Sequence, residues 1–124
     1  MVETRRVPPA RKMIDRYGGG GFHIGGESFK SSVLVASTVA VAWSARSPEE
    51  LTVECLAPLF AAGADFDLLL LGCGPRLRLP SVALRAALRS RGIALEPMDT
   101  GAACRTFNVL TSEERRVAAA LIAV

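Results

Sequence analysis

The sequence predicts an α/β fold in which helices pack against a β-sheet and β-hairpins precede them. Three observations carry this prediction. The C-terminal half alternates apolar runs with helical patterns, in the order strand, helix, strand, helix, strand. Glycine clusters separate short β-favouring segments near the N-terminus, which is typical of hairpins. The chain has 124 residues, of which 50% are hydrophobic, so it can bury one core without disulfides or metals.

The first third of the chain predicts an arm, hairpins and two strands. Residues 1–12, with two prolines and five charged side chains, predict a loose N-terminal arm. Residues 12–30 predict hairpins around their glycines. The segments 32–38 and 39–44 predict strands, and both are too apolar on both sides to be exposed edges of a sheet.

The first helical pattern covers residues 47–63. Ser47 is a candidate N-cap, a proline follows it, and Glu50 completes a capping box. Gly63 marks the end of this pattern. Pro58 lies inside it and should kink the helix or restart it, because proline lacks the backbone N–H that a helix interior needs.

The remaining elements are two helices and three strands. A helix is predicted over 80–92, where apolar residues recur and Gly92 ends the pattern. Another is predicted over 100–110, capped by Asp99 or Thr100. Strands are predicted over 65–74, 93–97 and 115–124. Because the last strand follows its helix by only a few residues, the pattern leaves its direction in the sheet open.

The charge and cysteine content limits the kinds of site that the chain can hold. The three cysteines, Cys55, Cys73 and Cys104, predict free thiols, and with the single histidine His23 they match no zinc spacing. We therefore expect no metal and no cofactor.

The net charge is +3, and residues 76–91 hold five arginines without an acidic residue. Such a cluster is either a solvated helix face or a surface for an acidic partner or phosphate. The candidate partner face consists of Arg76, Arg78, Arg85 and Arg89.

The segment "MDTGAACRTFNVL" (98–110) raises the question whether Cys104 is catalytic. On a helix, Cys104 shares a face with Phe107 and Leu110, and in such surroundings a thiol behaves as a small hydrophobe. A nucleophilic cysteine also needs a base, and His23 is distant in the sequence. We therefore expect Cys104 to be a packing residue.

A ligand site is possible where the strand over 65–74 ends in glycines. Open α/β sheets bind ligands at the carboxyl ends of their strands, and backbone amides there can hold an anion. The sequence "GCGPRL" lacks the third glycine of a dinucleotide site and the lysine of a P-loop, so a tight turn is the alternative. The candidate ligand or anion site comprises Gly72, Cys73, Gly74, Arg76, Asp99, Thr100, Thr106 and Asn108.

Several partner classes are disfavoured by composition. The few aromatic residues are not interleaved with the arginines, which argues against nucleic-acid binding. The longest apolar run, 33–43, is shorter than the roughly 20 residues that span a bilayer, so we expect no membrane span. No secretory leader is recognisable, which predicts a cytoplasmic protein.

The stretches "LLLLGCG", "ALRSRGIALEPMDTGAACRTFNVL" and "RRVAAALI" closely resemble the Mth-type domain family of unknown function. That family includes mitochondrial complex I assembly factor 3 and the adipogenesis-associated Mth-domain-containing protein. The resemblance covers 13–124, which it implies to be a single domain. It further implies a three-layer fold: a mixed central sheet with one antiparallel strand, which we expect to be the last, an extra N-terminal β layer, and flanking helices.

The resemblance also implies a function without established catalysis. The leading hypothesis is a non-catalytic accessory or assembly protein that docks to another protein and is linked to respiratory complex I assembly. The alternative is a small-molecule or anion-binding protein, or an enzyme, with its site at Gly72–Gly74. This chain departs from the family pattern at Cys73, where threonine is usual, at Phe107, where tyrosine is frequent, and at Glu114, where glycine is usual. The loss of that glycine argues against a positive-φ turn at 113–115. The remaining positions that match the family motif are Gly72, Gly74, Asp99, Thr100, Cys104, Thr106 and Asn108.

Overall fold

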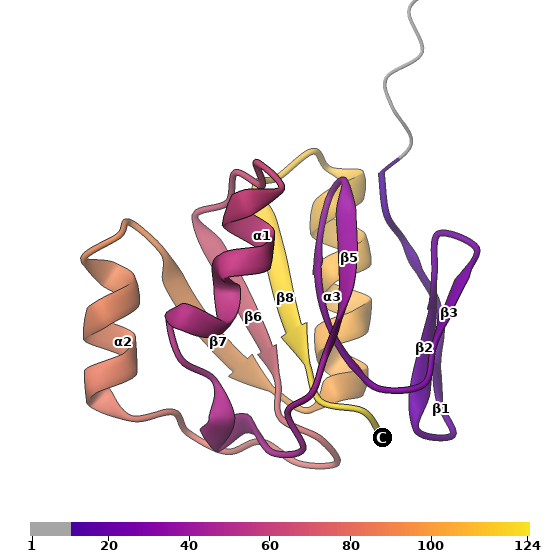
Figure 1. The fold of residues 1–124 in the computed structure, drawn as a ribbon, viewed down its shortest axis with the longest axis horizontal. Helices are drawn as coiled ribbons and strands as arrows, with labels where there is room; N and C mark the ends of the chain where they lie inside the picture. The colour runs from indigo at the N-terminus through magenta and orange to yellow at the C-terminus, as the bar shows by residue number, and fades with distance from the viewer. Residues whose placement is uncertain (1–10) are drawn as a thin grey trace, which may run out of the picture.

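A computed structural model describes residues 11–124 as two β-sheets and three α-helices (Figure 1). The predicted arm over 1–12 lies outside these residues except for its last two. The strands are β1 (Ile14–Gly18), β2 (Gly21–Ile24), β3 (Glu27–Phe29), β4 (Ser32–Ala36), β5 (Val39–Trp43), β6 (Leu68–Gly72), β7 (Ala94–Met98) and β8 (Val117–Leu121). The helices are α1 (Ala57–Ala61), α2 (Val82–Arg89) and α3 (Thr100–Ser112), with 3₁₀ turns η1 (Pro48–Glu50) and η2 (Glu54–Leu56).

The five-stranded sheet is mixed and has the order β5-β4-β8-β6-β7. β6 pairs in parallel with β7 and β8, whereas β4 pairs antiparallel with β5 and β8. The mixed sheet is thus confirmed, but the expectation that the last strand is the antiparallel one is wrong. α3 returns the chain along the sheet between β7 and β8, so β8 enters in the direction of its parallel neighbours. β4 is the strand that opposes the others.

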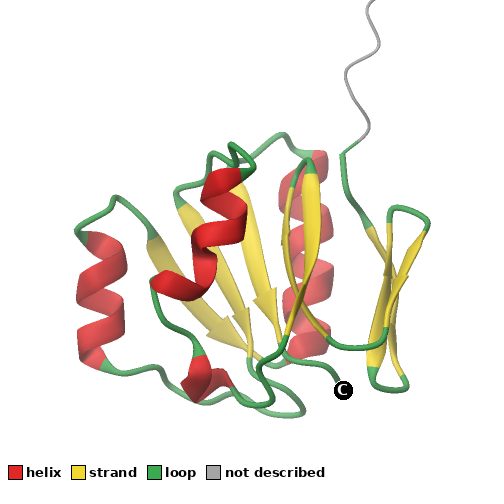
Figure 2. Cartoon of the chain, viewed as in Figure 1, coloured by secondary structure: helices red, strands yellow, loops and turns green. Residues whose placement is uncertain are grey.

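The sheet is covered on both faces, which gives three layers. α3 and the three-stranded sheet β1-β2-β3 pack on one face, and η1, η2, α1 and α2 pack on the other. Figure 1 shows α1 in front of the sheet and α3 behind it, and Figure 2 shows the separate N-terminal strands beside them. Successive β6 leucines alternate between the cores: Leu69 and Leu71 face α1 and α2, and Leu70 faces α3. The predicted N-terminal β layer is confirmed.

Of the two alternatives predicted for 47–63, a kinked helix and a restarted one, the kinked helix is wrong. The capping box of Ser47 and Glu50 is present, but it opens only one 3₁₀ turn, because Leu51 is extended with ψ at 125°. The chain restarts as η2 and the five-residue α1, in which Pro58 lies in the first turn, where its missing N–H breaks no hydrogen bond. The restart that Pro58 predicted is confirmed.

β5 is an edge strand, contrary to the expectation from its composition. Its valines Val39 and Val41 pack on one core and Ala40 packs on the other, so both of its faces are partly covered. Its pairing, in contrast, is with β4 alone. The apolar composition of β5 therefore indicates that its faces are covered, and it does not indicate a central position in the sheet.

The turn between α3 and β8 takes a left-handed residue after all. Glu114 has φ at 61°, the one positive φ outside glycine among residues 11–124. The turn is closed by the Arg115 N–H donating to the Leu110 carbonyl at 2.9 Å, as at many helix ends. The expectation that loss of a glycine removes this turn is wrong: the backbone bonds hold glutamate there.

Candidate functional site

The carboxyl ends of β6, β7 and β8 meet at one edge of the sheet. The register aligns Gly72 with Met98 and Leu121, so the residues that follow these three positions come together. The Gly74 N–H donates to the Thr100 hydroxyl oxygen at 2.8 Å, and the Thr100 N–H donates to the Gly74 carbonyl at 2.9 Å. The Thr100 hydroxyl donates to the Ile122 carbonyl at 2.8 Å. We call this arrangement of Gly72–Gly74, Thr100 and Ile122 the closed turn.

A close backbone approach explains the glycine at position 72. A Cβ there would lie 2.9 Å from Cδ2 of Leu121, so the leucine would have to shift, and 3.1 Å from Cα of Thr100, which is tighter than most Cβ contacts. The start of α3 consequently packs directly on the end of β6. The candidate ligand residues at this turn are a packing junction.

The amides of the closed turn are already bonded. The Cys73 N–H donates to the Met98 carbonyl at 2.8 Å, and Thr100 takes the Gly74 N–H. The Asp99 carboxylate accepts the Ala102 N–H at 2.9 Å, which is an ordinary N-cap and confirms Asp99 as the cap of α3. An anion at this edge would therefore meet no free amide of residues 73 or 74.

Thr106 and Asn108 lie away from the closed turn. Six and eight residues beyond Thr100 place them about 9 and 12 Å along the helix axis. The Asn108 amide accepts the Ile14 N–H at 2.8 Å and donates to the Ile14 carbonyl at 2.9 Å, so it binds α3 to β1. The structure brings Gly72, Cys73, Gly74, Asp99 and Thr100 together, but not these two residues.

Cys104 points into the core, as its helical spacing predicted. Its exposed fraction is 1%, and Phe107 packs in the same cluster. Burial raises the pKa of the Cys104 thiol to about 12, which outweighs the lowering by the Arg105 guanidinium. His23 bonds through Nε2 to the Ser28 hydroxyl at 2.8 Å on the β2–β3 hairpin. Cys104 borders a hollow of about 420 Å³ between β1 and α3 without being exposed to it. A protonated thiol in these surroundings is a packing group.

The four arginines of the candidate partner face differ in the contacts that their side chains make. Arg78 Nε lies 3.2 Å from the Glu49 carboxylate, and Arg85 donates through Nη1 to the Leu95 carbonyl at 3.0 Å. Arg76 is exposed in the loop after β6, and Arg89 is exposed in the last turn of α2. The face therefore spans the loop 75–81 and α2.

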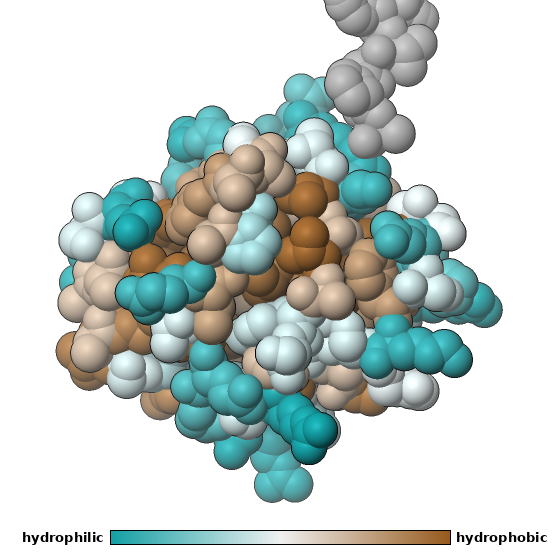
Figure 3. All heavy atoms as spheres, in the orientation of Figure 1, coloured by the Kyte–Doolittle hydropathy of each residue, from teal (hydrophilic) through white to brown (hydrophobic). Residues whose placement is uncertain are grey.

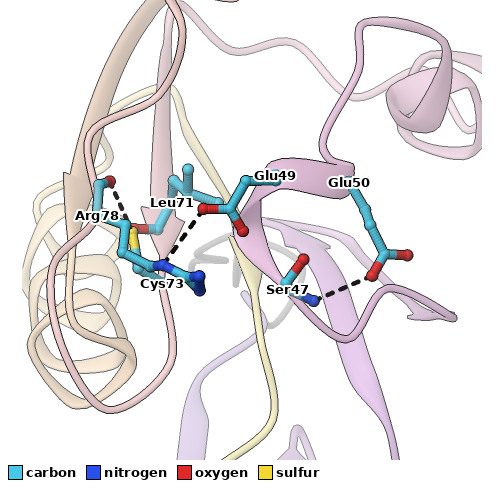
Figure 4. Close-up of polar contacts among 6 residues, drawn as sticks. All are labelled: Ser47, Glu49, Glu50, Leu71, Cys73 and Arg78. Atoms are coloured by element: carbon cyan, nitrogen blue, oxygen red, sulfur yellow. Dashed lines mark hydrogen bonds and ion pairs between the residues drawn. The ribbon is translucent and has the colours of Figure 1, made fainter.

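A groove beside these arginines was missed by sequence reasoning. It has a volume of about 170 Å³ and lies between η1, residues 78–81 and the start of α2. Figure 4 shows two of its lining residues, Glu49 and Arg78, joined by their ion pair, with the Cys73 thiol donating to the Arg78 carbonyl at 3.4 Å. The alternation of arginine and leucine over 76–79 was the available signal, but it fits a strand equally well. We call this site the η1–α2 groove; its lining residues are Pro48, Glu49, Leu51, Leu71, Arg78, Leu79, Pro80, Ser81 and Leu84.

The described residues hold neither a metal-binding cluster nor a membrane-spanning helix. Residues 11–124 contain no group of three or more histidine, cysteine, aspartate or glutamate side chains placed to hold a metal ion. In the same part of the chain, none of the helices has the length and apolar character needed to cross a bilayer.

Sequence comparison relates this chain to a named family and to named proteins. Residues 14–122 match the model of a family described as a protein of unknown function, DUF498/DUF598. The chain is 35% identical over 113 residues to a Danio rerio protein named NADH dehydrogenase (ubiquinone) 1 alpha subcomplex assembly factor 3. That alignment covers 91% of this chain but 65% of the relative, so the chain spans just under two thirds of the relative's length.

Structure comparison finds the same fold in solved bacterial proteins. A crystal structure from Bartonella henselae, described as an outer membrane protein, superposes with a TM-score of 0.82 at 36% identity and covers 94% of this chain and 98% of that one. A solution structure from Bordetella pertussis, described as a Mth938-like domain, superposes with a TM-score of 0.80 at 25% identity and covers 99% and 92%. The fold that the sequence predicted is therefore confirmed.

Proposed function

Because this chain belongs to the DUF498/DUF598 family, the Mth-type family that its C-terminal motif predicted, we propose that it is an accessory factor in the assembly of the respiratory NADH dehydrogenase complex. One observation carries the proposal. The similarity to a relative named as an assembly factor of that complex runs through almost the whole chain and is not confined to one motif.

The proposed mode of action is docking to another protein. Cys104 is buried and protonated, so it offers no reactive thiolate, and the N–H groups of Cys73 and Gly74 are already bonded within the fold. The loop 75–81 and α2, in contrast, expose arginines and large apolar side chains. Exposed apolar side chains among charged ones are typical of protein contacts.

Anion binding at Gly72–Gly74 is the alternative, and one observation favours it. A hollow of about 320 Å³ borders Cys73, Pro75, Arg76 and Arg78. Inorganic phosphate at 100 times its dissociation constant would stabilise the protein by about 2.7 kcal/mol. A thermal shift with phosphate that is lost in Arg76→Ser would support this alternative, whereas no shift at high phosphate concentration would argue against it.

The assembly role is tested by deleting the gene in the organism that carries it. We expect less assembled complex on native gels, accumulation of subassemblies, and lower NADH:quinone reductase activity per milligram of membrane protein. Re-expression of the wild-type chain should restore all three, and normal assembly in the deletion strain would overturn the proposal. Fractionation of the rescued strain tests whether the chain lies in the cytoplasm, as we propose, or at the outer membrane, which the description of the Bartonella relative names.

A further inference from the structure

We propose that the η1–α2 groove binds one large apolar side chain from a partner segment whose neighbouring residues are acidic. The inference rests on the proposed docking function and adds the chemistry of the partner. Three properties of the groove carry it: its size and lining, the exposed apolar residues beside it, and the charge of its surroundings.

The size and lining of the groove fit a single side chain. An apolar cavity of roughly 150 Å³ can hold a benzene molecule, and this groove measures about 170 Å³. Its walls are formed by leucines and prolines, while Glu49, Arg78 and Ser81 are the polar members of its lining. Ser81 already caps α2 by accepting the Leu84 N–H at 3.1 Å. A leucine or phenylalanine side chain would therefore meet mainly hydrocarbon.

The surface next to the groove exposes large apolar side chains. Among residues 11–124, five large hydrophobic residues are strongly exposed, and three of these fall within 77–82. They are Leu77 at 54%, Leu79 at 78% and Val82 at 83%. Figure 3 shows brown surface at the lower end of α2, where that helix begins. Exposed apolar residues that serve no contact are usually dispersed singly over a protein surface. Their concentration here indicates an interaction surface.

The charge of the surroundings selects an acidic partner. Residues 75–92 carry five arginines and no acidic residue; of these, Arg78 lines the groove and Arg76 lies in the same loop. Glu49 is the one carboxylate in the lining of the groove, and Arg78 pairs with it where both side chains are at least half exposed. An exposed pair of this kind is weak, so a partner carboxylate can take the place of Glu49 beside Arg78. Complementary charges then steer the partner and fix its orientation.

The test uses a synthetic peptide array. Each peptide carries a central leucine, isoleucine, methionine or phenylalanine flanked by two to four aspartates or glutamates. Matched sets replace the central residue with serine or the acidic flanks with lysine. We expect selective binding of the acidic set with an apolar centre, and at least a tenfold weaker dissociation constant in fluorescence polarisation for both matched sets. Equal binding of all sets, or of the lysine set alone, overturns the proposal.

Variants of exposed residues locate the binding site without disturbing the fold. Leu79→Glu and the double variant Arg76→Glu, Arg89→Glu should each weaken binding of the selected peptide at least tenfold. Val109→Glu and Arg115→Glu are the controls, because these residues are also exposed but lie on α3 and in the turn after it. Peptide-induced NMR shifts should fall on residues 48–51 and 78–84. Shifts confined elsewhere, or controls that weaken binding equally, overturn the proposal.

Two further results separate this inference from the proposed function. If deletion leaves complex assembly normal but the groove binds acidic apolar peptides, the assembly role fails and the groove stands. If wild-type and Leu79→Glu chains rescue assembly equally and the peptides do not bind, the groove fails and the assembly role stands.

A dimer in sedimentation equilibrium that Leu79→Glu dissociates would assign the groove to a second copy of the chain and overturn the acidic partner. Binding of RNA or anionic vesicles that Leu79→Ser weakens would assign the groove to a nucleic acid or a membrane and would also overturn it.

Discussion

The closed turn and the η1–α2 groove lie next to each other in the chain and differ in how their groups are satisfied. In the closed turn, Gly74 and Thr100 exchange backbone and hydroxyl hydrogen bonds, and Thr100 is fully buried. A few residues later, Leu77, Leu79 and Val82 expose half or more of their surface. The first region has its partners within the fold, whereas the second presents apolar surface that the fold does not cover.

The difference separates residues that build the domain from residues that are free to contact something else. Three positions that match the family motif serve packing: Cys104 in the core, Thr100 at the closed turn, and Asn108 between α3 and β1. Thr111 Oγ1 is the one buried side-chain polar atom without a partner among residues 11–124. A conspicuous motif is thus compatible with a purely structural role, and substitutions can measure how sharply the two regions differ.

The largest effect is expected for Thr100→Val. Valine keeps the shape of threonine but leaves the Gly74 N–H and the Ile122 carbonyl buried without their partner. Each unsatisfied group costs about 1–3 kcal/mol, so the free energy of unfolding should fall by about 2–5 kcal/mol. Urea denaturation measures it. Thr100→Ser keeps the hydroxyl and should recover most of the loss. A change below about 1 kcal/mol for Thr100→Val would show that the turn is not closed as described.

The next effect is a pH dependence from Cys104. Its pKa rises from 9.0 to about 12 in the folded protein, so the folded thiol keeps a proton that the unfolded chain releases. The contribution is intact below pH 9.0 and is lost as the pH rises from there towards 12. Between these values the free energy of unfolding should fall by about 1.4 kcal/mol per pH unit more than in Cys104→Ala.

Urea denaturation of both proteins between pH 8 and 10.5 measures this difference, because other groups titrate alike in the two chains. Equal slopes would place the thiol in contact with solvent. Iodoacetamide provides a second check: half-buried Cys55 should react well before Cys104.

The sequence predicted the elements whose local signals agree with their tertiary surroundings. α3 has a capping aspartate and a regular apolar face, and it begins and packs as expected. The prediction of one helix over 47–63 was wrong because two prolines and an extended Leu51 divide the segment into turns too short to show helical periodicity. The direction of β8 and the edge position of β5 depend on which strands pair, and strand pairing leaves no mark in local composition.

The residues of the candidate site that come together were likewise predicted only in part. Strand ends brought Gly72–Gly74 and Thr100 together as expected, because parallel neighbours finish at one edge. The η1–α2 groove unites Glu49 of the 3₁₀ turn η1 with Arg78 and Leu79 of the loop 75–81, and these two segments lie far apart in the sequence. No spacing rule connects such segments, so the groove became visible only in three dimensions.

A smaller effect is expected for Glu114→Gly, which probes backbone strain in the turn between α3 and β8. Glu114 has φ at 61°, a conformation that costs a residue with a Cβ roughly 1–2 kcal/mol. Glycine removes this cost but gives the unfolded chain more freedom, so the free energy of unfolding should rise by about 0.5–1 kcal/mol. Thermal and urea denaturation measure it. Glu113→Gly is the control and should not stabilise the protein, since its φ of −89° suits any residue. A loss of stability in Glu114→Gly would mean that its side chain contributes more than its backbone costs.

The smallest effect is expected for Leu79→Ser in the η1–α2 groove. Leu79 is 78% exposed, so the folded protein gains little from its side chain, and the free energy of unfolding should change by less than about 0.5 kcal/mol. Binding of the acidic apolar peptide should nevertheless weaken, because the leucine then belongs to the contact and not to the core. This separation of stability from binding is what the comparison with Thr100 predicts. A loss above 1 kcal/mol in urea denaturation would instead make the loop part of the packed fold, and the contrast between the two regions would disappear.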